Sequence, residues 1–263
     1  MRSVIIRFGI LVIIIVAGVV WYIVPDSFFV EYSDVVDNSV KEKEIAKQKE
    51  QKIKENKKKQ VKTQEQKKLV NKIKQSVFFT VQAPHAQWSD EKYQDACEEA
   101  CALMAHMWVQ DKNRLSKNEV EAELEKMFVK EKEMFGEDVL DTSAEDTAKF
   151  MREYYDMDIE VKKSITMQDL YDLLAQDTII IVPTNGKWLN NPHFSNGGPE
   201  RHMLVLIGYN KNNKEFVTND PGTRFGKNYK YKDSVLYNAI RDYQTGHKKD
   251  ITGSAKNVIV VRK

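Results

Sequence analysis

The stretch QDACEEACALMAHMW, residues 94–108, decides the fold because it places a cysteine at the start of an amphipathic helix. Asp95 and Glu98 have the spacing of a capping box, so the helix is predicted to begin at Asp95 and to run to about Val109. Cys97 then takes the second helical position, where its backbone N–H has no partner within the helix and the positive end of the helix dipole lies near its sulfur. Both features favour a thiolate, the nucleophilic form of cysteine.

Two later segments supply the partners that a cysteine nucleophile needs. RHMLVLIGY at 201–209 places His202 at the start of an apolar strand, which is a rigid platform for a catalytic base. VTNDPG at 217–222 places Asp220 at the end of the next strand. His193, in the loop NNPHFSNGG, is the second choice as base, and a structural role for His202 is the third.

A hairpin is predicted to join these two strands through the turn NKNNK. If Tyr209 pairs with Glu215, His202 and Asp220 lie diagonally on one face of the sheet, within reach of each other. A slip of one residue would present Asn219 instead. Spacing alone therefore leaves both Asn219 and Asp220 open as the orienting residue, and an acid before a Pro-Gly pair also suits a plain turn.

The residues around the cysteine oppose a thiolate. Asp95, Glu98 and Glu99 are close negative charges that would raise the pKa of the thiol, so activation requires an ion pair with a protonated histidine. Cys101 lies on the same helix and is predicted to pack in the core. Two cysteines four apart on one helix do not suit a disulfide, and the sequence has no metal-binding or phosphate-binding motif, so neither a metal nor a cofactor is expected.

Gln82 in FTVQAP, Cys97, His202 and Asp220 together resemble the glutamine, cysteine, histidine and aspartate of the double-glycine-leader (bacteriocin-processing) peptidases, family thirty-nine of the cysteine peptidases. The resemblance covers roughly residues 78–262 and implies a papain-like fold. It also implies the roles: Cys97 attacks a carbonyl, His202 transfers the proton, Asp220 orients His202, and Gln82 stabilises the oxyanion with the N–H of Cys97.

Two details depart from that pattern or compete with it. Gln87 and Gln94 lie nearer to Cys97 in the sequence than Gln82 does, and compete for the oxyanion role. The pair Glu98-Glu99 follows the cysteine where many leader peptidases have glycine and a small residue, which weakens the case for double-glycine specificity.

The remaining pattern predicts an α+β domain in which a helical half packs on a mainly antiparallel sheet. Helices are predicted at 95–109, 118–135, 143–155, 167–175 and 234–243. Thr142 and Glu145 can form a capping box for the third of these helices, and Thr166 directly precedes the fourth. Strands are predicted at 77–81, 159–161, 178–183, 202–209, 214–219 and 256–263.

An apolar run near the N-terminus predicts a membrane anchor. FGILVIIIVAGVVWYIV, residues 8–24, has no charged side chain, is near the lower length limit for a spanning helix, and is long for a signal-peptide core. No small-residue cleavage pattern follows, and Trp21 and Tyr22 suit the membrane interface, so an uncleaved anchor is favoured over a removed signal peptide. Arg2 and Arg7 precede the run and acidic residues follow it, which predicts a cytoplasmic N-terminus and an extracytoplasmic domain.

Residues 41–75 contain fourteen Lys and five Glu, an excess of nine positive charges. Such a stretch is either a nucleic-acid or lipid patch, or a solvated stalk. Its apolar side chains recur every eight residues, which fits neither a heptad nor a wide amphipathic face. A helical or disordered stalk is therefore favoured, and no nucleic-acid partner is expected. The predicted division is an anchor at 1–25, a stalk at 26–75 and a globular domain at 76–263.

The sequence thus predicts a membrane-anchored, extracytoplasmic cysteine peptidase whose partners are a protein or peptide substrate and the membrane. Three alternatives stay open. The first is a related acyl-transfer enzyme such as a cell-wall amidase. The second is a non-catalytic binding domain on the same fold, and the third is an anchored structural protein whose stalk is the working part.

Overall fold

The computed structural model describes residues 47, 49–55, 57, 71–136, 141–246 and 250–263, and divides the chain into a unit at 1–63 and a unit at 64–263. In the first unit, residues 47, 49–55 and 57 are helical. No helix among the described residues is long and apolar enough to cross a membrane. The predicted span at 8–24 lies outside the described residues, so the anchor stays a prediction.

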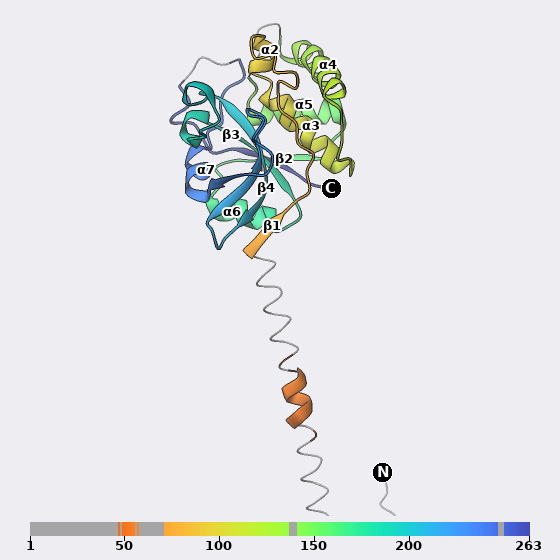
Figure 1. Ribbon diagram of the computed structural model, residues 1–263, viewed down its shortest axis with the longest axis vertical. Coiled ribbons are helices and arrows are strands. Elements are labelled where there is room, and N and C mark those ends of the chain that lie inside the picture. Colours follow the sequence, from red (N-terminus) through yellow and green to blue (C-terminus); the bar gives the residue numbers. More distant parts are fainter. Residues whose placement is uncertain (1–46, 48, 56, 58–70, 137–140, 247–249) are drawn as a thin grey trace, which may run out of the picture. The chain divides into compact units, whose positions relative to one another are not determined.

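The described residues of the second unit form a seven-stranded sheet with six α-helices and two short 3-10 helices (Figure 1). The α-helices are α2 (Glu91–Gln94), α3 (Cys97–Val109), α4 (Lys117–Phe135), α5 (Ala144–Tyr155), α6 (Met167–Leu174) and α7 (Asp233–Ala239). The 3-10 helices are η1 (Gly186–Leu189) and η2 (Ser195–Gly197). The strands are β1 (Lys72–Lys74), β2 (Ile159–Lys162), β3 (Ile179–Thr184), β4 (His202–Asn210), β5 (Glu215–Asn219), β6 (Tyr229–Lys232) and β7 (Val258–Val261).

The strands follow the order β2-β7-β3-β4-β5-β6, and β1 pairs with β4 beside this path. Every pairing of these strands is antiparallel. The predicted α+β class, with helices packed against an antiparallel sheet, is therefore confirmed.

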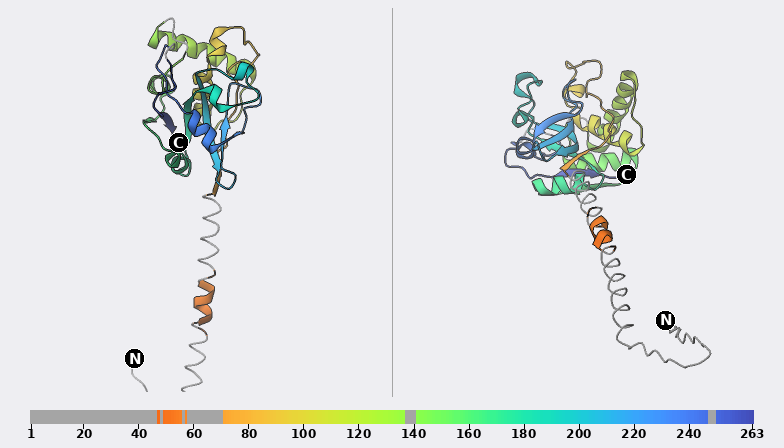
Figure 2. Two further views of the ribbon diagram at one scale, coloured as in Figure 1. Left: turned by 90° about the vertical axis from the view of Figure 1, so that its left-hand side faces the viewer. Right: turned by 60° about the horizontal axis from the view of Figure 1, so that its bottom comes forward.

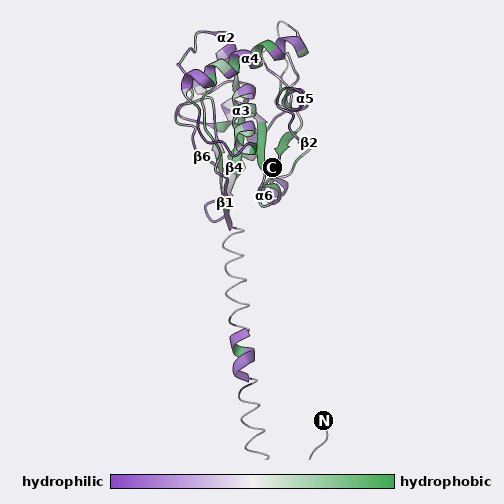
Figure 3. Ribbon diagram, turned by 90° about the vertical axis from the view of Figure 1, so that its right-hand side faces the viewer, coloured by the Kyte–Doolittle hydropathy of each residue, from purple (hydrophilic) through white to green (hydrophobic). Residues whose placement is uncertain are grey.

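Both faces of the sheet are buried. Ile179 and Ile181 of β3 belong to the core on the side of α3, α4 and α5, whereas Ile180 and Val182 belong to the core on the side of α6 and α7. This two-residue alternation is the one that a strand imposes on its side chains. Figure 2 shows the helices on the two sides of the sheet, and Figure 3 shows α4 covering the domain with mostly hydrophilic residues. The helices thus cover two faces, rather than forming the single helical half that the sequence predicts.

Helix capping agrees with the sequence at one helix and differs at another. Thr166 caps α6 and forms a capping box with Asp169, as its position before the helix predicts. The predicted capping box of Thr142 and Glu145 is wrong, because Ser143 is the N-cap of α5 and accepts a hydrogen bond from the N–H of Asp146.

Three predicted elements differ from the structure. Residues 77–81 do not form a strand, because the carbonyl oxygens of Val77 and Phe78 accept hydrogen bonds from the Asn219 side chain and not from a neighbouring strand. The sheet begins instead at β1, a few residues before the predicted domain boundary at 76. The helix predicted at 234–243 ends at Ala239, and the sequence analysis missed β6.

The hairpin of β4 and β5 has two registers. At its tip Tyr209 pairs with Phe216, one residue away from the predicted pairing with Glu215. A β-bulge between Leu206 and Gly208 then shifts the register, so that Val205 pairs with Asn219, as the predicted register requires. The prediction was therefore wrong at the turn and correct at the end of the hairpin that carries His202.

Candidate active site

Cys97 occupies the first position of α3 and not the predicted second. The predicted capping by Asp95 is wrong, because Asp90 begins the separate helix α2 and accepts a hydrogen bond from the N–H of Lys92. Asp95 ends α2, and Ala96 precedes α3 without a side-chain cap. The N–H of Cys97 is still in the first turn, where such groups have no acceptor within the helix, so the helix dipole still favours a thiolate there.

The sulfur of Cys97 is buried between α3 and the start of β4. The N–H of Met203 donates a hydrogen bond to it at 3.2 Å, and an oxygen of the Glu98 carboxyl lies 2.9 Å from it. Burial, followed by the neighbouring Glu98 carboxyl, raises the pKa of Cys97 well above its usual value. The thiol therefore holds its proton until a base removes it.

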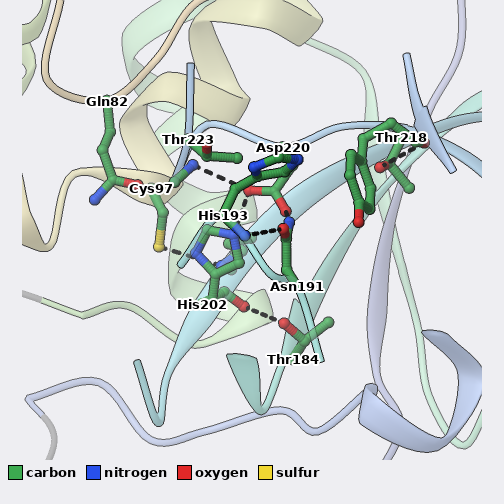
Figure 4. A network of polar contacts seen from close by, with 12 residues as sticks. Gln82, Cys97, Thr184, Asn191, His193, His202, Thr218, Asp220 and Thr223 are labelled. Atoms are coloured by element: carbon green, nitrogen blue, oxygen red, sulfur yellow. Dashed lines mark hydrogen bonds and ion pairs between the residues drawn. The ribbon is translucent and has the colours of Figure 1, made fainter. Parts of the chain in front are cut away.

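His202 and Asp220 form a buried pair at the adjacent ends of β4 and β5. Nε2 of His202 lies 2.8 Å from Oδ1 of Asp220, and the two residues are 1% and 0% exposed. Asp220 engages Nε2 of the ring and leaves the other ring nitrogen, Nδ1, without a contact to this carboxylate. Figure 4 shows the Cys97 sulfur beside the His202 ring. The structure thus brings together the cysteine, the histidine and the aspartate that the sequence singles out.

Further hydrogen bonds fix the Asp220 carboxylate. The N–H of Gly222 donates to Oδ1 at 3.0 Å, and the hydroxyl of Tyr231 donates to Oδ2 at 2.6 Å. The amide of Asn191 lies 2.7 Å from the Tyr231 oxygen and 3.5 Å from Oδ2. Burial alone would raise the pKa of Asp220, but the charge of His202 and these hydrogen bonds together lower it. Asp220 therefore stays ionised and can hold the imidazole ring in one orientation.

The sequence analysis did not single out Tyr231 or Asn191. Tyr231 lies on β6, where the sequence YKYK alternates apolar and charged residues as a half-buried strand does, and that alternation is a signal from which the strand could be found. Asn191 lies in the loop between η1 and η2, and the composition of that loop gives no indication of its partners.

Asn219 has a structural position beside Asp220. Its amide nitrogen donates to the carbonyl oxygen of Phe78 at 3.1 Å, and its side-chain oxygen accepts from the N–H of Asn228 at 3.0 Å. These bonds point away from His202. The sequence leaves open whether Asn219 or Asp220 contacts His202, and in the structure Asp220 makes that contact.

Gln82 lies near Cys97, but its donors point elsewhere. Its amide nitrogen donates to the carbonyl oxygens of Tyr93 at 3.2 Å and Gln94 at 2.5 Å. Its side-chain oxygen is buried and has no hydrogen-bond partner among the described residues. Exchanging the two atoms would set that oxygen against two carbonyl oxygens, so the network fixes the amide in this orientation. Gln82 therefore lies at the site without presenting an N–H to it.

Cys97 and His202 line one cleft of about 1010 Å³. Gln82 and Trp88 line it from the segment that precedes α2, and Phe225 lines it from the segment that follows β5. Trp88 and Phe225 are 40% and 50% exposed, which is unusual for side chains of this size. The cleft thus offers aromatic surface to a bound chain next to the buried sulfur.

Gly222 allows the close packing at the rear of the His202 ring. A Cβ atom at this position would lie 2.9 Å from Cε1 of His202 and 3.0 Å from a ring atom of Phe194. Phe194 also packs edge-on against the imidazole, with ring centroids 5.2 Å apart. A glycine is therefore required beside the histidine for steric reasons.

Comparison with known proteins identifies a family for this chain. A family model described as the peptidase C39-like family matches residues 74–251. The chain belongs to the peptidase C39-like family. A crystal structure described as a C39-like peptidase from Bacillus anthracis is 14% identical, with a TM-score of 0.33, and the match covers 46% of this chain and 59% of that one. No curated protein matches the chain.

The other described histidines of this C39-like chain lie apart from the His202–Asp220 pair. His193 lines the cleft, with its ring 4.5 Å from that of Phe225. His106 stacks on Tyr155, with ring centroids 4.0 Å apart. His85 lies 3.8 Å from a carboxylate oxygen of Glu121. His247 is outside the described residues.

Four acidic residues are buried near Cys97 of this C39-like domain. They are Glu98, Glu99, Glu131 and Asp141. Burial raises the pKa of Glu131 to about 7 and raises those of Glu98 and Glu99 well above their usual value. Glu99 and Glu131 share a side-chain hydrogen bond. Among the described residues, no group of three or more acidic, histidine or cysteine side chains is arranged to hold a metal ion.

Proposed function

We propose that this member of the peptidase C39-like family is a membrane-anchored cysteine peptidase that acts outside the cytoplasm. The observation that carries the proposal is the position of Cys97 in the first turn of α3, beside a histidine whose Nε2 lies 2.8 Å from the buried Asp220 carboxylate. A nucleophile, a base and a group that orients the base are the parts that thiol hydrolysis needs.

The proposed reaction begins when His202 takes the proton of the Cys97 thiol. The thiolate attacks the carbonyl carbon of a peptide bond and forms a tetrahedral intermediate. His202 then gives its proton to the leaving amine as the C–N bond breaks, which leaves a thioester on Cys97. A water molecule, deprotonated by His202, attacks the thioester and releases the acid and the free thiol. Asp220 holds the ring and stabilises its charge throughout.

The negative oxygen of the tetrahedral intermediate needs hydrogen-bond donors. The N–H of Cys97 is such a donor, because it lies in the first turn of α3. Gln82 is the proposed second donor. It reaches this role when substrate binding turns its amide away from the carbonyl oxygens of Tyr93 and Gln94.

Thiol labelling tests the proposed nucleophile. The chain has two cysteines, and both are buried, at 2% and 0% exposed, but Cys97 lines the cleft beside His202. Iodoacetamide should therefore modify Cys97 faster than Cys101 at neutral pH, by on the order of tenfold or more. Fragment-ion mass spectrometry assigns the modified residue. Equal rates, or faster modification of Cys101, would count against Cys97 as the nucleophile.

Product analysis answers a separate question, the class of substrate. Hydrolysis of peptides would support a peptidase, and hydrolysis of cell-wall fragments would support an amidase.

A reporter fusion tests the proposed location. A reporter that works only outside the cytoplasm, fused after Lys263, should be active, because basic residues precede the apolar run at 8–24 and acidic residues follow it. Replacing Arg2 and Arg7 with glutamate provides the matched control and should reduce that activity. Activity of a cytoplasm-specific reporter at the same position would contradict both the orientation and the location.

A further inference from the structure

The mechanism above does not use the contact between Glu98 and the Cys97 sulfur. Oε2 of Glu98 lies 2.9 Å from Sγ, and Oε1 accepts a hydrogen bond from the Tyr243 hydroxyl at 2.6 Å. Glu98 is 2% exposed, and each of its two oxygens contacts a protein group. A carboxyl this close to the proposed nucleophile affects the formation of a thiolate.

At least one of these two groups has to carry a proton. A thiolate and a carboxylate 2.9 Å apart repel each other strongly in a buried site, so the two groups are not ionised together. If only the sulfur carries a proton, Glu98 is a carboxylate whose charge opposes formation of the Cys97 thiolate. If Oε2 carries a proton, Glu98 is a neutral acid whose O–H points at the sulfur.

The surroundings of Glu98 favour the neutral acid. Burial, then the neighbouring carboxyl groups of Asp141 and Glu99, raise the pKa of Glu98 well above its usual value. The groups that face Glu98 come from three places. They are Cys97 and Glu99 on α3, Asp141 before α5, and Tyr243 after α7. Tyr243 donates its hydroxyl proton to Oε1, a bond that the carbonyl oxygen of a neutral acid accepts as well.

We infer that Glu98 is a protonated carboxylic acid that positions the Cys97 sulfur and stabilises its thiolate by donating a hydrogen bond from Oε2. The inference rests on the proposed function of Cys97 as nucleophile. The thiolate then accepts hydrogen bonds from two fixed donors, the Glu98 O–H and the Met203 N–H, and faces the charge of protonated His202. The proton that leaves the sulfur goes to His202, and the proton of Glu98 stays where it is.

The test measures the pKa of the Cys97 thiol in the full chain carrying Cys101→Ala, where Cys97 is the sole thiol. The pKa is read from the pH dependence of alkylation by iodoacetamide. Glu98→Gln is neutral and keeps an N–H donor, so it should leave the thiol pKa within about half a pH unit of the parent. Glu98→Met has a similar length without a donor and should raise the thiol pKa by about one to two pH units.

The outcomes separate the two charge states of Glu98. If Glu98 is ionised in the parent, Glu98→Gln removes a negative charge next to the sulfur and lowers the thiol pKa by about one to three pH units. Such a fall would overturn the inference, and so would equal pKa values in the Gln and Met variants. Glu99→Gln is the matched control: it removes a buried carboxyl that bonds to Glu131 and not to the sulfur, and should leave the thiol pKa unchanged.

A second variant covers the case in which Glu98→Gln does not fold. Tyr243→Phe removes the donor to Oε1, which makes a carboxylate harder to maintain. The thiol pKa should stay at the parent value if Glu98 is already neutral and should fall if Glu98 is ionised. His202→Ala in the same background tests the proposed function by itself. If it leaves alkylation unchanged, and the parent hydrolyses no peptide, Cys97 is not the nucleophile, whatever the Glu98 variants show.

Discussion

His202→Ala should lower kcat/KM for peptide hydrolysis by roughly 10⁴-fold or more, because it removes the proton carrier and the charge that stabilises the Cys97 thiolate. Cys97→Ala should lose activity to a similar extent, since the two residues act as a unit. Labelling of Cys97 by a thiol-directed probe should fall together with hydrolysis in the His202 variant. The measurement is the steady-state rate on a fluorogenic peptide, with the unfolding temperature of each variant determined first.

Two neighbouring substitutions provide the control. Asp220→Asn should cost less than His202→Ala, roughly 10² to 10⁴-fold, because the amide still faces Nε2 but lacks the charge that stabilises the imidazolium. Asn219→Ala should lower stability and change the activity of the folded fraction least, because its bonds hold the segment at Phe78 and not the imidazole. Loss of activity in Asn219→Ala but not in Asp220→Asn would make Asn219 the orienting residue. If neither matters and His193→Ala is inactive, the assignment of His202 fails.

The domain should become less stable as the pH rises from 5 to 8. Burial raises the pKa of Glu131 from 4.5 to about 7, and it also raises the pKa values of Glu98 and Glu99 well above their usual value. The unfolded chain releases these protons near its ordinary pKa, whereas the folded domain keeps them, so the free energy of unfolding falls through this window. For Glu131 alone the loss is about 3 kcal/mol, from about 1.4 kcal/mol per pH unit. Denaturant titrations at several pH values measure it.

Two other groups set the limits of this effect. Burial lowers the pKa of His106, so its contribution to stability has the opposite sign below its ordinary pKa of 6.5. Asp220 has a lowered pKa, and its contribution is lost only as the pH falls below its ordinary pKa of 3.8. Neither group reverses the fall in the free energy of unfolding that Glu98, Glu99 and Glu131 cause between pH 5 and 8.

Glu131→Gln isolates the contribution of one carboxyl. Its free energy of unfolding should match the parent near pH 5 and exceed it by about 2 to 3 kcal/mol at pH 8, because glutamine has no proton to lose. Glu133→Gln, on the same helix with a side chain 64% exposed, is the matched control and should leave the pH dependence unchanged. Parallel curves for the parent and Glu131→Gln would show that burial does not hold the proton there.

The parts of the site that the sequence predicts best are those set by local pattern. His202 opens an unbroken apolar strand, and Asp220 closes the next one, so strand alternation and the order of the elements place both. Tyr231 and Asn191 reach the same carboxylate from elements distant in sequence, and their contact depends on the full order of the sheet. The spacing of neighbouring residues in a single sequence therefore does not predict these contacts.

The remaining differences between the predictions and the structure arise where a local sequence pattern fits more than one arrangement. Asp90 and Asp95 both have the chemistry of an N-cap, and the chain uses Asp90 for a helix of its own. The register of the hairpin depends on a bulge that alternation alone does not indicate, because Ile207 is as apolar as its neighbours. Glu98 is expected from the sequence to form a capping box with Asp95, but it is buried and bonds to Tyr243, 145 residues away.

The bulge in β4 also bears on how such a domain changes in evolution. Ile207 is the extra residue, its carbonyl oxygen accepts a hydrogen bond from the N–H of Gln75, and Gly208 beside it gives β1 room to approach. On one side of this point lies the exposed tip of the hairpin, and on the other lies the pair of His202 and Asp220. Insertions and deletions accumulate at exposed tips, where they cost little. The bulge fixes the position of the strand between these two regions. The tip can therefore change in length during evolution without moving His202 and Asp220 at the other end of the hairpin.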